Sequence, residues 1–283
     1  MRRMIRLLSA GFNRIKKNPL FYIFIIITLI FETYLVFSTY RQMTTAWVFD
    51  DLIDFSKMLF NSLFLGLFGA IFVSSFLGED YYNGAVRNKI IVGCNRKKIY
   101  LSNFVLMATV MIFYLGILLI VLFGLGLTLF GKPELSVNVL LMSVLIVGII
   151  MLAYTSILVF IGMISSSMTR SITLSMLLSI ILLIGSAFIN SILDEPKTIN
   201  SYIIENGENK LKEEPNPRYP SDSKRRMLET LNKMNPAGAV LSVATNIENR
   251  ETEKNGELAL YSLGVIIVFT CAGVYLFDKK DLS

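Results

Sequence analysis

The chain has 283 residues, of which 54% are hydrophobic and 17% are charged, and its mean hydropathy is +0.60. Soluble domains average ~45–50% apolar and about 25% charged residues, so a water-facing shell could not cover this much apolar surface. The composition therefore predicts a membrane protein. Because the sequence has no histidine, it lacks the usual zinc ligand and the base of Ser-His and Cys-His catalysis. A structural disulfide is not expected either, since Cys94 falls in a predicted loop and Cys271 in a predicted membrane helix.

The first 18 residues have an amphipathic pattern. Apolar residues recur at helical spacing from Met1 to Ile15, and arginine and lysine occupy the other face. This pattern is typical of a helix that lies in the lipid headgroup layer, and a simple basic flank before a membrane span is the alternative. Pro19 then allows a sharp turn. No small-x-small cleavage site follows the first apolar run, so a cleaved signal peptide is not predicted.

Six apolar stretches are long enough to cross a bilayer core, which takes about 20 helical residues. They run over 20–37, 58–77, 101–130, 137–164, 172–193 and 258–277, with a short break at 131–134 between the third and the fourth. The two longest imply tilt or an interfacial extension. The fold class is therefore an all-α polytopic membrane protein in which both ends of the chain lie on one side.

The basic residues indicate which side that is. Three lie in the two short loops opposite the ends of the chain: Arg41, Lys57 and Lys132. Fourteen lie on the side of those ends: Arg2, Arg3, Arg6, Arg14, Lys16, Lys17, Arg87, Lys89, Arg96, Lys97, Lys98, Arg170, Lys279 and Lys280. Short cytoplasmic loops are enriched in lysine and arginine, so we expect both ends to be cytoplasmic and the net charge of +6 to reflect orientation rather than nucleic-acid binding.

The predicted cytoplasmic loop over 79–100 carries the most informative pattern. Asn83 is a candidate cap for a short helix, and Gly93 a candidate stop. Val86 and Ile90 would share one face of this helix, forming an apolar surface flanked by basic residues that could dock in a groove of a soluble partner. An ordinary basic turn is the alternative. Asn95 is expected to cap the helix that continues as the third span.

This loop resembles the first cytoplasmic loop of ATP-binding-cassette permeases of the type-2 exporter class. The resemblance rests on an acid, a glycine and Ala-Val-Arg-Asn at 85–88, followed by a glycine and Asn-Arg-Lys-Lys-Ile-Tyr-Leu-Ser at 95–102. It extends over the chain through the N-terminal helix, the six spans, Asn-Pro-Ala-Gly at 235–238 and the ending over 277–282. It implies a permease dimer, homo- or heteromeric, bound to two cytosolic ATPases, with this loop as the coupling helix. On that resemblance, the residues that contact or position the ATPase are Glu79, Gly84, Val86, Arg87, Lys89 and Ile90.

Two rows of small or polar residues lie within the spans. Ser62, Gly66, Ala70, Ser74 and Gly78 recur every four residues in the second span, which predicts a close helix contact within one subunit or across a dimer.

The fifth span has a more polar row that includes Ser171, Ser175, Ser179, Ser186 and Asn190. Its members either bond to neighbouring helices or line a translocation pathway.

Glu32 is the ionisable side chain within the predicted spans. It is a candidate for gating or substrate contact, because burying a charge in lipid is costly. Its alternative is a residue near the outer interface that reaches water or stays protonated.

The long loop over 194–257 is expected to be extracellular. Ser221 or Asp222 could cap an amphipathic helix that ends near Asn235, and Pro236 favours a new helix start. The apolar segment 237–243 is too short to span and fits a re-entrant or surface-lying element. The domain organisation is thus an interfacial helix (1–18), spans one to five (19–193), an external helical insertion (194–257), and span six with a cytoplasmic tail (258–283).

These features favour the transmembrane subunit of an ATP-driven exporter of the plasma membrane in bacteria, with an amphipathic peptide, an antibiotic or a lipid as cargo. ATP and Mg²⁺ would bind the partner ATPase, because the chain has no Gly-x-x-x-x-Gly-Lys-Ser/Thr loop. The expected partners are that ATPase, a second permease and membrane lipid. An ion-coupled carrier or channel that uses Glu32 is the alternative. An intramembrane enzyme is disfavoured, because the predicted spans hold neither histidine nor aspartate.

Overall fold

The computed structural model describes residues 2–46, 59–131, 136–165, 167–205, 208–249 and 251–280. Six of its helices are long and apolar enough to cross a membrane: α2 (Pro19–Ala46), α4 (Ser62–Tyr82), α6 (Arg96–Leu129), α7 (Val137–Ile164), α8 (Met168–Leu193) and α11 (Asn255–Lys279). The remaining elements are α1 (Arg2–Lys17), α5 (Ala85–Ile91), strands β1 (Thr198–Glu205) and β2 (Glu208–Pro215), α9 (Asp222–Met234), α10 (Pro236–Glu248) and a short 3₁₀ helix (Thr252–Lys254). Lys57, Lys132 and most of the predicted break at 131–134 lie outside the described residues.

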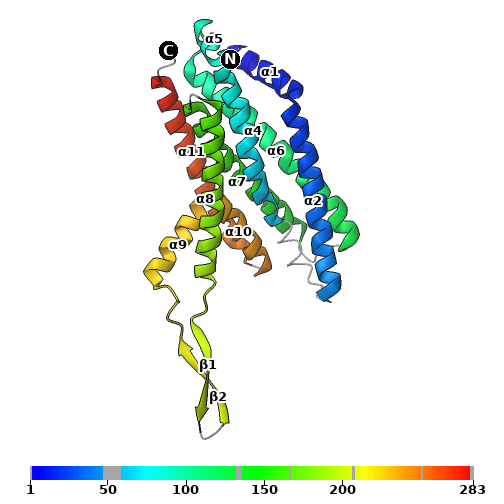
Figure 1. Cartoon of the computed structure of the whole chain (residues 1–283), viewed down its shortest axis with the longest axis vertical. Coiled ribbons are helices and arrows are strands. Elements are labelled where there is room, and N and C mark those ends of the chain that lie inside the picture. Colours follow the sequence, from blue (N-terminus) through cyan, green and yellow to red (C-terminus); the bar gives the residue numbers. More distant parts are fainter. Residues whose placement is uncertain are drawn as a thin grey trace.

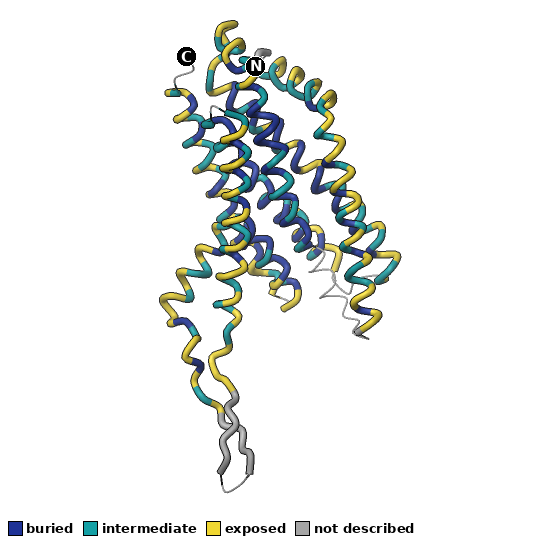
Figure 2. Tube along the Cα trace, in the orientation of Figure 1, coloured by how far each residue is buried: buried dark blue, intermediate teal, exposed yellow. Residues whose placement is uncertain are grey.

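The six long helices form one elongated bundle, and both ends of the described chain lie at the same end of it (Figure 1). We call this the terminal end and the other the distal end. α4 and α7 are the most buried of the six, and α2, α8 and α11 leave most of their surface exposed (Figure 2). The main pairings are α7 with α11, α4 with α8 and α4 with α7. The core is therefore a centre of α4, α6 and α7, and the outer helices turn broad apolar faces outward.

Glycines and tyrosines set the close approach of these helices. A β-carbon at Gly66 of α4 would lie 2.6 Å from the Tyr154 ring of α7. Small residues let helix backbones approach in this way, which is the main source of packing where lipid supplies no hydrophobic drive between helices. Tyr114 of α6 adds a polar link, donating its hydroxyl to the Phe21 carbonyl of α2 (3.2 Å).

The N-terminal helix α1 rests on the bundle with part of its apolar face. Ile15 is buried, and Leu8 and Phe12 pack against the core. Gly11 lies directly against the Leu106 side chain of α6, which lets the two helices cross closely. Ile5, near the start of α1, stays 62% exposed. The amphipathic face predicted to lie in lipid is thus divided, because its second half finds a partner on α6.

The segment between α8 and α11 contains a β-hairpin in addition to the expected helices. β1 and β2 pair antiparallel from Thr198↔Pro215 to Glu205↔Glu208, and the hairpin extends beyond the distal end of the bundle (Figure 1). Residues 206 and 207, which connect the strands, lie outside the described residues; their sequence, Asn-Gly, is the dipeptide that two-residue hairpins favour. The helices predicted for this insertion are present as α9 and α10, and the hairpin is an addition that the sequence analysis does not predict.

After the hairpin, α9 and α10 return the chain to the bundle. Ser221 stands at the N-cap position of α9 but makes no capping hydrogen bond with its side chain. Asn235 caps α10 by accepting from the Ala237 amide (3.0 Å), and Pro236 follows as its first residue. Most of the apolar face of α10 is buried against α4, α7 and α8. Of the two alternatives for 237–243, this burial favours a re-entrant element over a surface-lying one.

Candidate functional site

The short helix α5 forms the turn between α4 and α6 at the terminal end. Gly84 precedes it with φ of 64°, a left-handed conformation that a β-carbon disfavours. Gly93, with φ of 82°, ends the turn after it. The prediction that Asn83 caps α5 is wrong: α4 continues to Tyr82, and Asn83 instead ends α4. Asn95 caps α6 as predicted, accepting from the Lys97 amide (2.9 Å).

The apolar face of α5 points inward rather than outward. Val86 is 1% exposed and belongs to the packed core, and Ile90 is half-buried against it. The prediction that this pair forms a surface for a partner is therefore wrong, because the end of the bundle already covers it. Other residues form the exposed α5 face: Tyr82, Arg87, Asn88, Ile91 and Val92. Val92 is 78% exposed and Ile91 is 72% exposed, so the turn presents two apolar side chains at the terminal end.

A buried carboxylate holds α5 in place. Asp80, in the last turn of α4, is 1% exposed and pairs with Arg14 of α1 and with Lys89 of α5, whose Nζ lies 3.0 Å from Oδ2. Arg14 also donates to the Phe76 carbonyl (3.2 Å), and its guanidinium lies over the Phe76 ring, 3.7 Å from the ring centre. One carboxylate thus joins α1, α4 and α5.

Both cations of this cluster are partly withdrawn from water. Burial lowers the pKa of Arg14, against a smaller opposing effect of Glu79. The pKa of Lys89 is also lowered, to about 8, mainly by burial and in smaller part by the neighbouring Arg14 charge. On the family resemblance, Lys89 would contact or position the ATPase, and in the structure it pairs with Asp80. Through this pair, Lys89 helps to hold α5 in position.

Asp80 is the residue that sequence reasoning missed. In the sequence, Glu79 and Asp80 fall at the start of the predicted cytoplasmic loop over 79–100. α4 in fact runs on to Tyr82, and the spacing of its buried residues Phe72, Val73, Phe76 and Leu77 continues to position 80. Extending the helical periodicity by one turn would have separated the buried Asp80 from the half-exposed Glu79.

The C-terminal end of α11 is tied to the same region. Lys280 donates to the Met163 carbonyl at the end of α7 (3.2 Å) and lies 4.3 Å from the centre of the Tyr81 ring. Tyr81 donates its hydroxyl to the same carbonyl. Arg96, at the start of α6, donates to the Asp278 carbonyl (3.0 Å). Contacts among α4, α6, α7 and α11 therefore hold together the part of the terminal end that surrounds α5.

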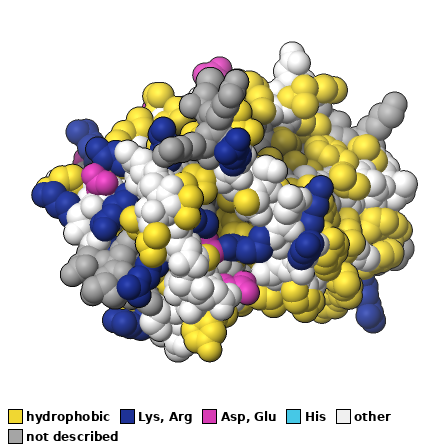
Figure 3. Space-filling model, turned by 90° about the horizontal axis from the view of Figure 1, so that it is seen from above, with side chains coloured by type: hydrophobic (Ala, Val, Ile, Leu, Met, Phe, Trp, Pro, Cys, Tyr) yellow, Lys and Arg dark blue, Asp and Glu magenta, His cyan; other side chains and the backbone are white. Residues whose placement is uncertain are grey.

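The terminal end is also a basic face. Seen along the bundle axis, lysine and arginine side chains are spread over it with few acidic ones (Figure 3). α1, the α5 turn, the start of α6 and the end of α11 all contribute. The side of the molecule predicted to be cytoplasmic thus gathers its positive charge around the exposed α5 face.

The small-residue row of α4 faces α7 and α8. Ser62, Gly66, Ala70, Ser74 and Gly78 are all buried. Ser74 and Ser175 share a hydrogen bond (2.6 Å) across the contact with α8. A β-carbon at Gly78 would lie 2.7 Å from the Met168 backbone at the start of α8. In this subunit the row serves contacts within the chain.

The other predicted pathway residues are spread along the bundle. Glu32 is 1% exposed and accepts from the Asn61 amide (3.1 Å). Ser179 and Ser186 are buried on α8, and Ser186 donates to the Leu183 carbonyl of its own helix (2.9 Å).

Asn190, the last residue of the polar row on α8, contacts α9. Its Oδ1 accepts from the Asn232 amide (3.0 Å). The structure therefore does not bring the pathway candidates Glu32, Ser179, Ser186 and Asn190 together into one site. Over the described ranges, no three histidine, cysteine, aspartate or glutamate side chains are grouped to hold a metal ion.

Comparison with known proteins agrees with this architecture. The family model described as "ABC-2 family transporter protein" matches residues 37–282. No curated protein matches the chain. The matched range includes all six apolar helices except the first part of α2, and it contains the α5 turn. The chain therefore belongs to the ABC-2 family of transporter proteins, as a multi-pass membrane subunit that works with an ATP-binding-cassette ATPase.

Proposed function

We propose that this chain is the permease subunit of an ATP-driven exporter, and that the exposed α5 face is where its ATPase docks. The observation that carries the proposal is the contrast between the two sides of α5. The inner side is locked to the bundle through Val86 and the Asp80 cluster, whereas the outer side presents Ile91 and Val92 to solvent beside Arg87. A short helix with an apolar and basic outer face suits a groove on a soluble partner.

The same construction would transmit motion. A push on α5 would reach α4 through Asp80 and α1 through Arg14, because the pairs with Arg14 and Lys89 leave the carboxylate little freedom. It would reach α7 and α11 through Tyr81 and Lys280. The partner would bind ATP and Mg²⁺ and hydrolyse ATP, and the helices of this chain would move in response to form the translocation pathway.

The remaining assignments rest on charge and on surface. The excess of lysine and arginine on the terminal end favours a cytoplasmic location for both ends, in the plasma membrane of a bacterium. The broad apolar faces of α2, α8 and α11 fit lipid and a second permease subunit. The cargo would be an amphipathic peptide, an antibiotic or a lipid, moved outward.

Docking can be tested with substitutions that leave the buried side of α5 intact. Ile91→Asp and Val92→Asp should each lower co-purification of the ATPase at least tenfold and abolish permease-dependent stimulation of its activity, because a charge would enter an apolar contact. The first candidate partner to test is any ATP-binding-cassette ATPase that a neighbouring reading frame encodes. Met227→Asp, at an exposed apolar side chain of α9 on the distal end, is the matched control and should bind normally.

Arg87→Asp tests the electrostatic part, and its effect should weaken as salt rises. If Ile91→Asp and Val92→Asp variants bind and stimulate the ATPase as the unchanged chain does, the exposed α5 face is not the docking surface. Val86→Asp is unsuited to this experiment, since it would place a charge in the core.

A further inference from the structure

Two cavities meet near the distal end of α11. The first, of about 580 Å³, is an apolar groove along α11, lined there by Leu260, Tyr261, Gly264 and Val268 among others. The second, of about 370 Å³, is a polar pocket between the end of α8, α9, α10 and the start of α11. Glu257 lines both, so the groove and the pocket adjoin.

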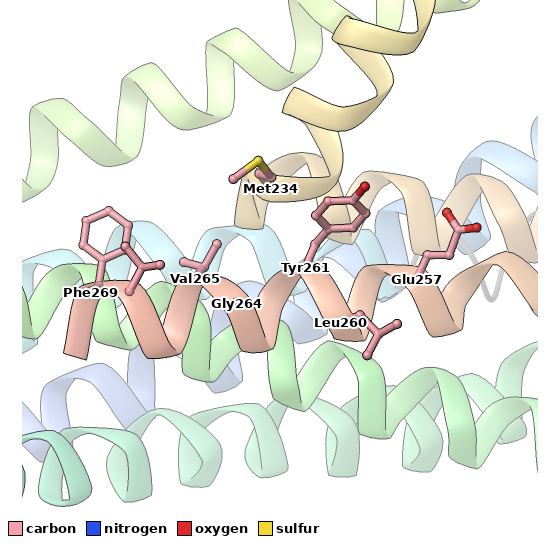
Figure 4. Close-up of a pocket in the computed structure, with 8 residues that line it drawn as sticks. Met234, Glu257, Leu260, Tyr261, Gly264, Val265 and Phe269 are labelled. Carbon is pink, nitrogen blue, oxygen red and sulfur yellow. The ribbon is translucent and has the colours of Figure 1, made fainter. Parts of the chain in front are cut away.

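The groove is a built feature of the bundle. Val265 packs on Ala153 and Ile157 of α7, and Phe269 meets Phe160 of α7 edge-on with ring centres 5.4 Å apart. Met234, at the end of α9, overhangs α11 on the side of Tyr261 and Val265 (Figure 4). The lining runs from position 257 to position 269, which is about 18 Å of helix at ~1.5 Å per residue. One leaflet of a hydrocarbon core of roughly 30 Å is about 15 Å deep, so the groove has the length of one acyl leaflet.

The polar pocket holds one donor and one acceptor that are buried without a partner among the described residues. Asn232 is 3% exposed, and its Oδ1 accepts no hydrogen bond. The Nδ2 of Asn190 donates none. Buried polar groups are normally paired, so two unpaired amide atoms in one pocket are consistent with a bound water or a polar ligand group. Side chains of both charges surround these amides, including the Lys233–Glu257 pair (2.5 Å) and the Lys254–Glu251 pair (2.5 Å).

We infer that the groove and pocket together bind a membrane phospholipid with a zwitterionic, amine-bearing head group. One acyl chain would lie along α11, and the head group would enter the polar pocket. Its phosphate would accept from Asn190 and the lysines, and its ammonium would donate to Asn232 and the glutamates. Phosphatidylethanolamine has both groups, whereas phosphatidylcholine lacks the N–H donors and phosphatidylglycerol lacks the cation. The site does not depend on the ATPase, so it can be tested on the purified chain.

The experiment titrates the purified full-length chain in detergent with each of the three lipids, with identical acyl chains, and counts bound lipid by native mass spectrometry. Phosphatidylethanolamine should bind at one molecule per chain and at least tenfold more tightly than the other two. Gly264→Trp should weaken it at least tenfold, because a β-carbon there meets nothing within 4 Å and a large side chain can fill the groove without disturbing the fold. Ile267→Trp is the matched control: it lies on the same helix at similar depth, is 62% exposed and lines neither cavity, so binding should be unchanged.

Glu257→Gln should leave binding of the acyl chain intact but bring the affinity for phosphatidylethanolamine down towards that for phosphatidylcholine, because it weakens an acceptor for the ammonium at the junction of groove and pocket. Gly264→Leu serves as a smaller filling substitution if Gly264→Trp does not fold. Equal binding of the three lipids by the unchanged chain would overturn the inference, as would unchanged binding by the filled groove. A dimer mass that Gly264→Trp converts to monomer, with lipid binding unaffected, would assign the groove to a second copy of the chain instead.

Discussion

At the scale of single residues, the Asp80 carboxylate does most to determine how the terminal end is held together. It pairs with two cations from two other helices while being almost fully buried. A buried ion pair is weak evidence for added stability, since desolvation offsets much of the attraction, but removing one partner leaves charge uncompensated. The main role of the cluster is therefore to determine the position of α5 on the bundle.

The coupling within this cluster is measurable by a double-mutant cycle of Arg14→Gln and Asp80→Asn. Asp80→Asn should destabilise the folded chain by about 1–3 kcal/mol, because Arg14 and Lys89 lose their charged partner. The double mutant should lose less free energy of unfolding than the two single mutants added together. The difference should be about 0.5–3 kcal/mol, as expected for residues in direct contact. Unfolding in mixed micelles of sodium dodecyl sulfate and a mild detergent provides the measurement.

Asp278→Asn is the control for that cycle. Asp278 pairs with Lys97 at 3.7 Å, and both side chains are largely exposed. Exposed pairs contribute about 0–1 kcal/mol, so this change should be close to neutral. Strictly additive effects of Arg14→Gln and Asp80→Asn would show that the two residues do not act together.

At the scale of elements, α4 is the helix on which the others converge. It contacts α2, α5, α6, α7, α8 and α10, and small residues on it admit the ring of Tyr154 and the backbone at Met168. Close approach at these points places α4 between α7 and α8 and brings its last turn under α5. The geometry of the exposed α5 face thus depends on packing along α4, from Gly78 in its last turns back to Gly66 near its start.

Enlarging Gly66 tests this dependence. Gly66→Val should destabilise the chain by about 1–3 kcal/mol, because the new side chain meets the Tyr154 ring and a packed interior resists overfilling. Gly124→Val on α6 is the control, since a β-carbon there meets nothing within 4 Å. Unfolding of both variants in the same mixed micelles should separate them clearly. Equal stability of the two would mean that the approach of α4 to α7 is not tight.

At the scale of the whole molecule, the two ends of the bundle differ in chemistry. The terminal end is basic and presents the exposed α5 face. The distal end carries α9, the β-hairpin and the polar pocket beside an apolar groove. Such a division fits a protein that meets a soluble partner on one side and amphipathic molecules on the other.

The orientation of these ends in the membrane can be tested by cysteine labelling. In a background of Cys94→Ser and Cys271→Ala, Met227→Cys on α9 should react with a membrane-impermeant maleimide in intact cells. Val92→Cys should react only after the cells are permeabilised, because the positive charge around it favours the cytoplasm. Both side chains are exposed, so access to the reagent is decided by sidedness. Labelling of Val92→Cys in intact cells would reverse the assigned topology.

The sequence by itself determined the number of spans, their order, the cap at Asn95 and the helix start at Pro236, because length, hydropathy and capping are local properties. It also carried the family resemblance that the family match over residues 37–282 confirms. Only the tertiary structure decided which face of α5 is free, since the burial of Val86 and Ile90 depends on helices distant in the chain. The same holds for Asp80, whose partners lie 66 and nine residues away, and for the adjoining cavities at the distal end. Periodicity indicates that one face of a helix is apolar, but whether lipid, a partner or the rest of the protein covers that face is determined by packing.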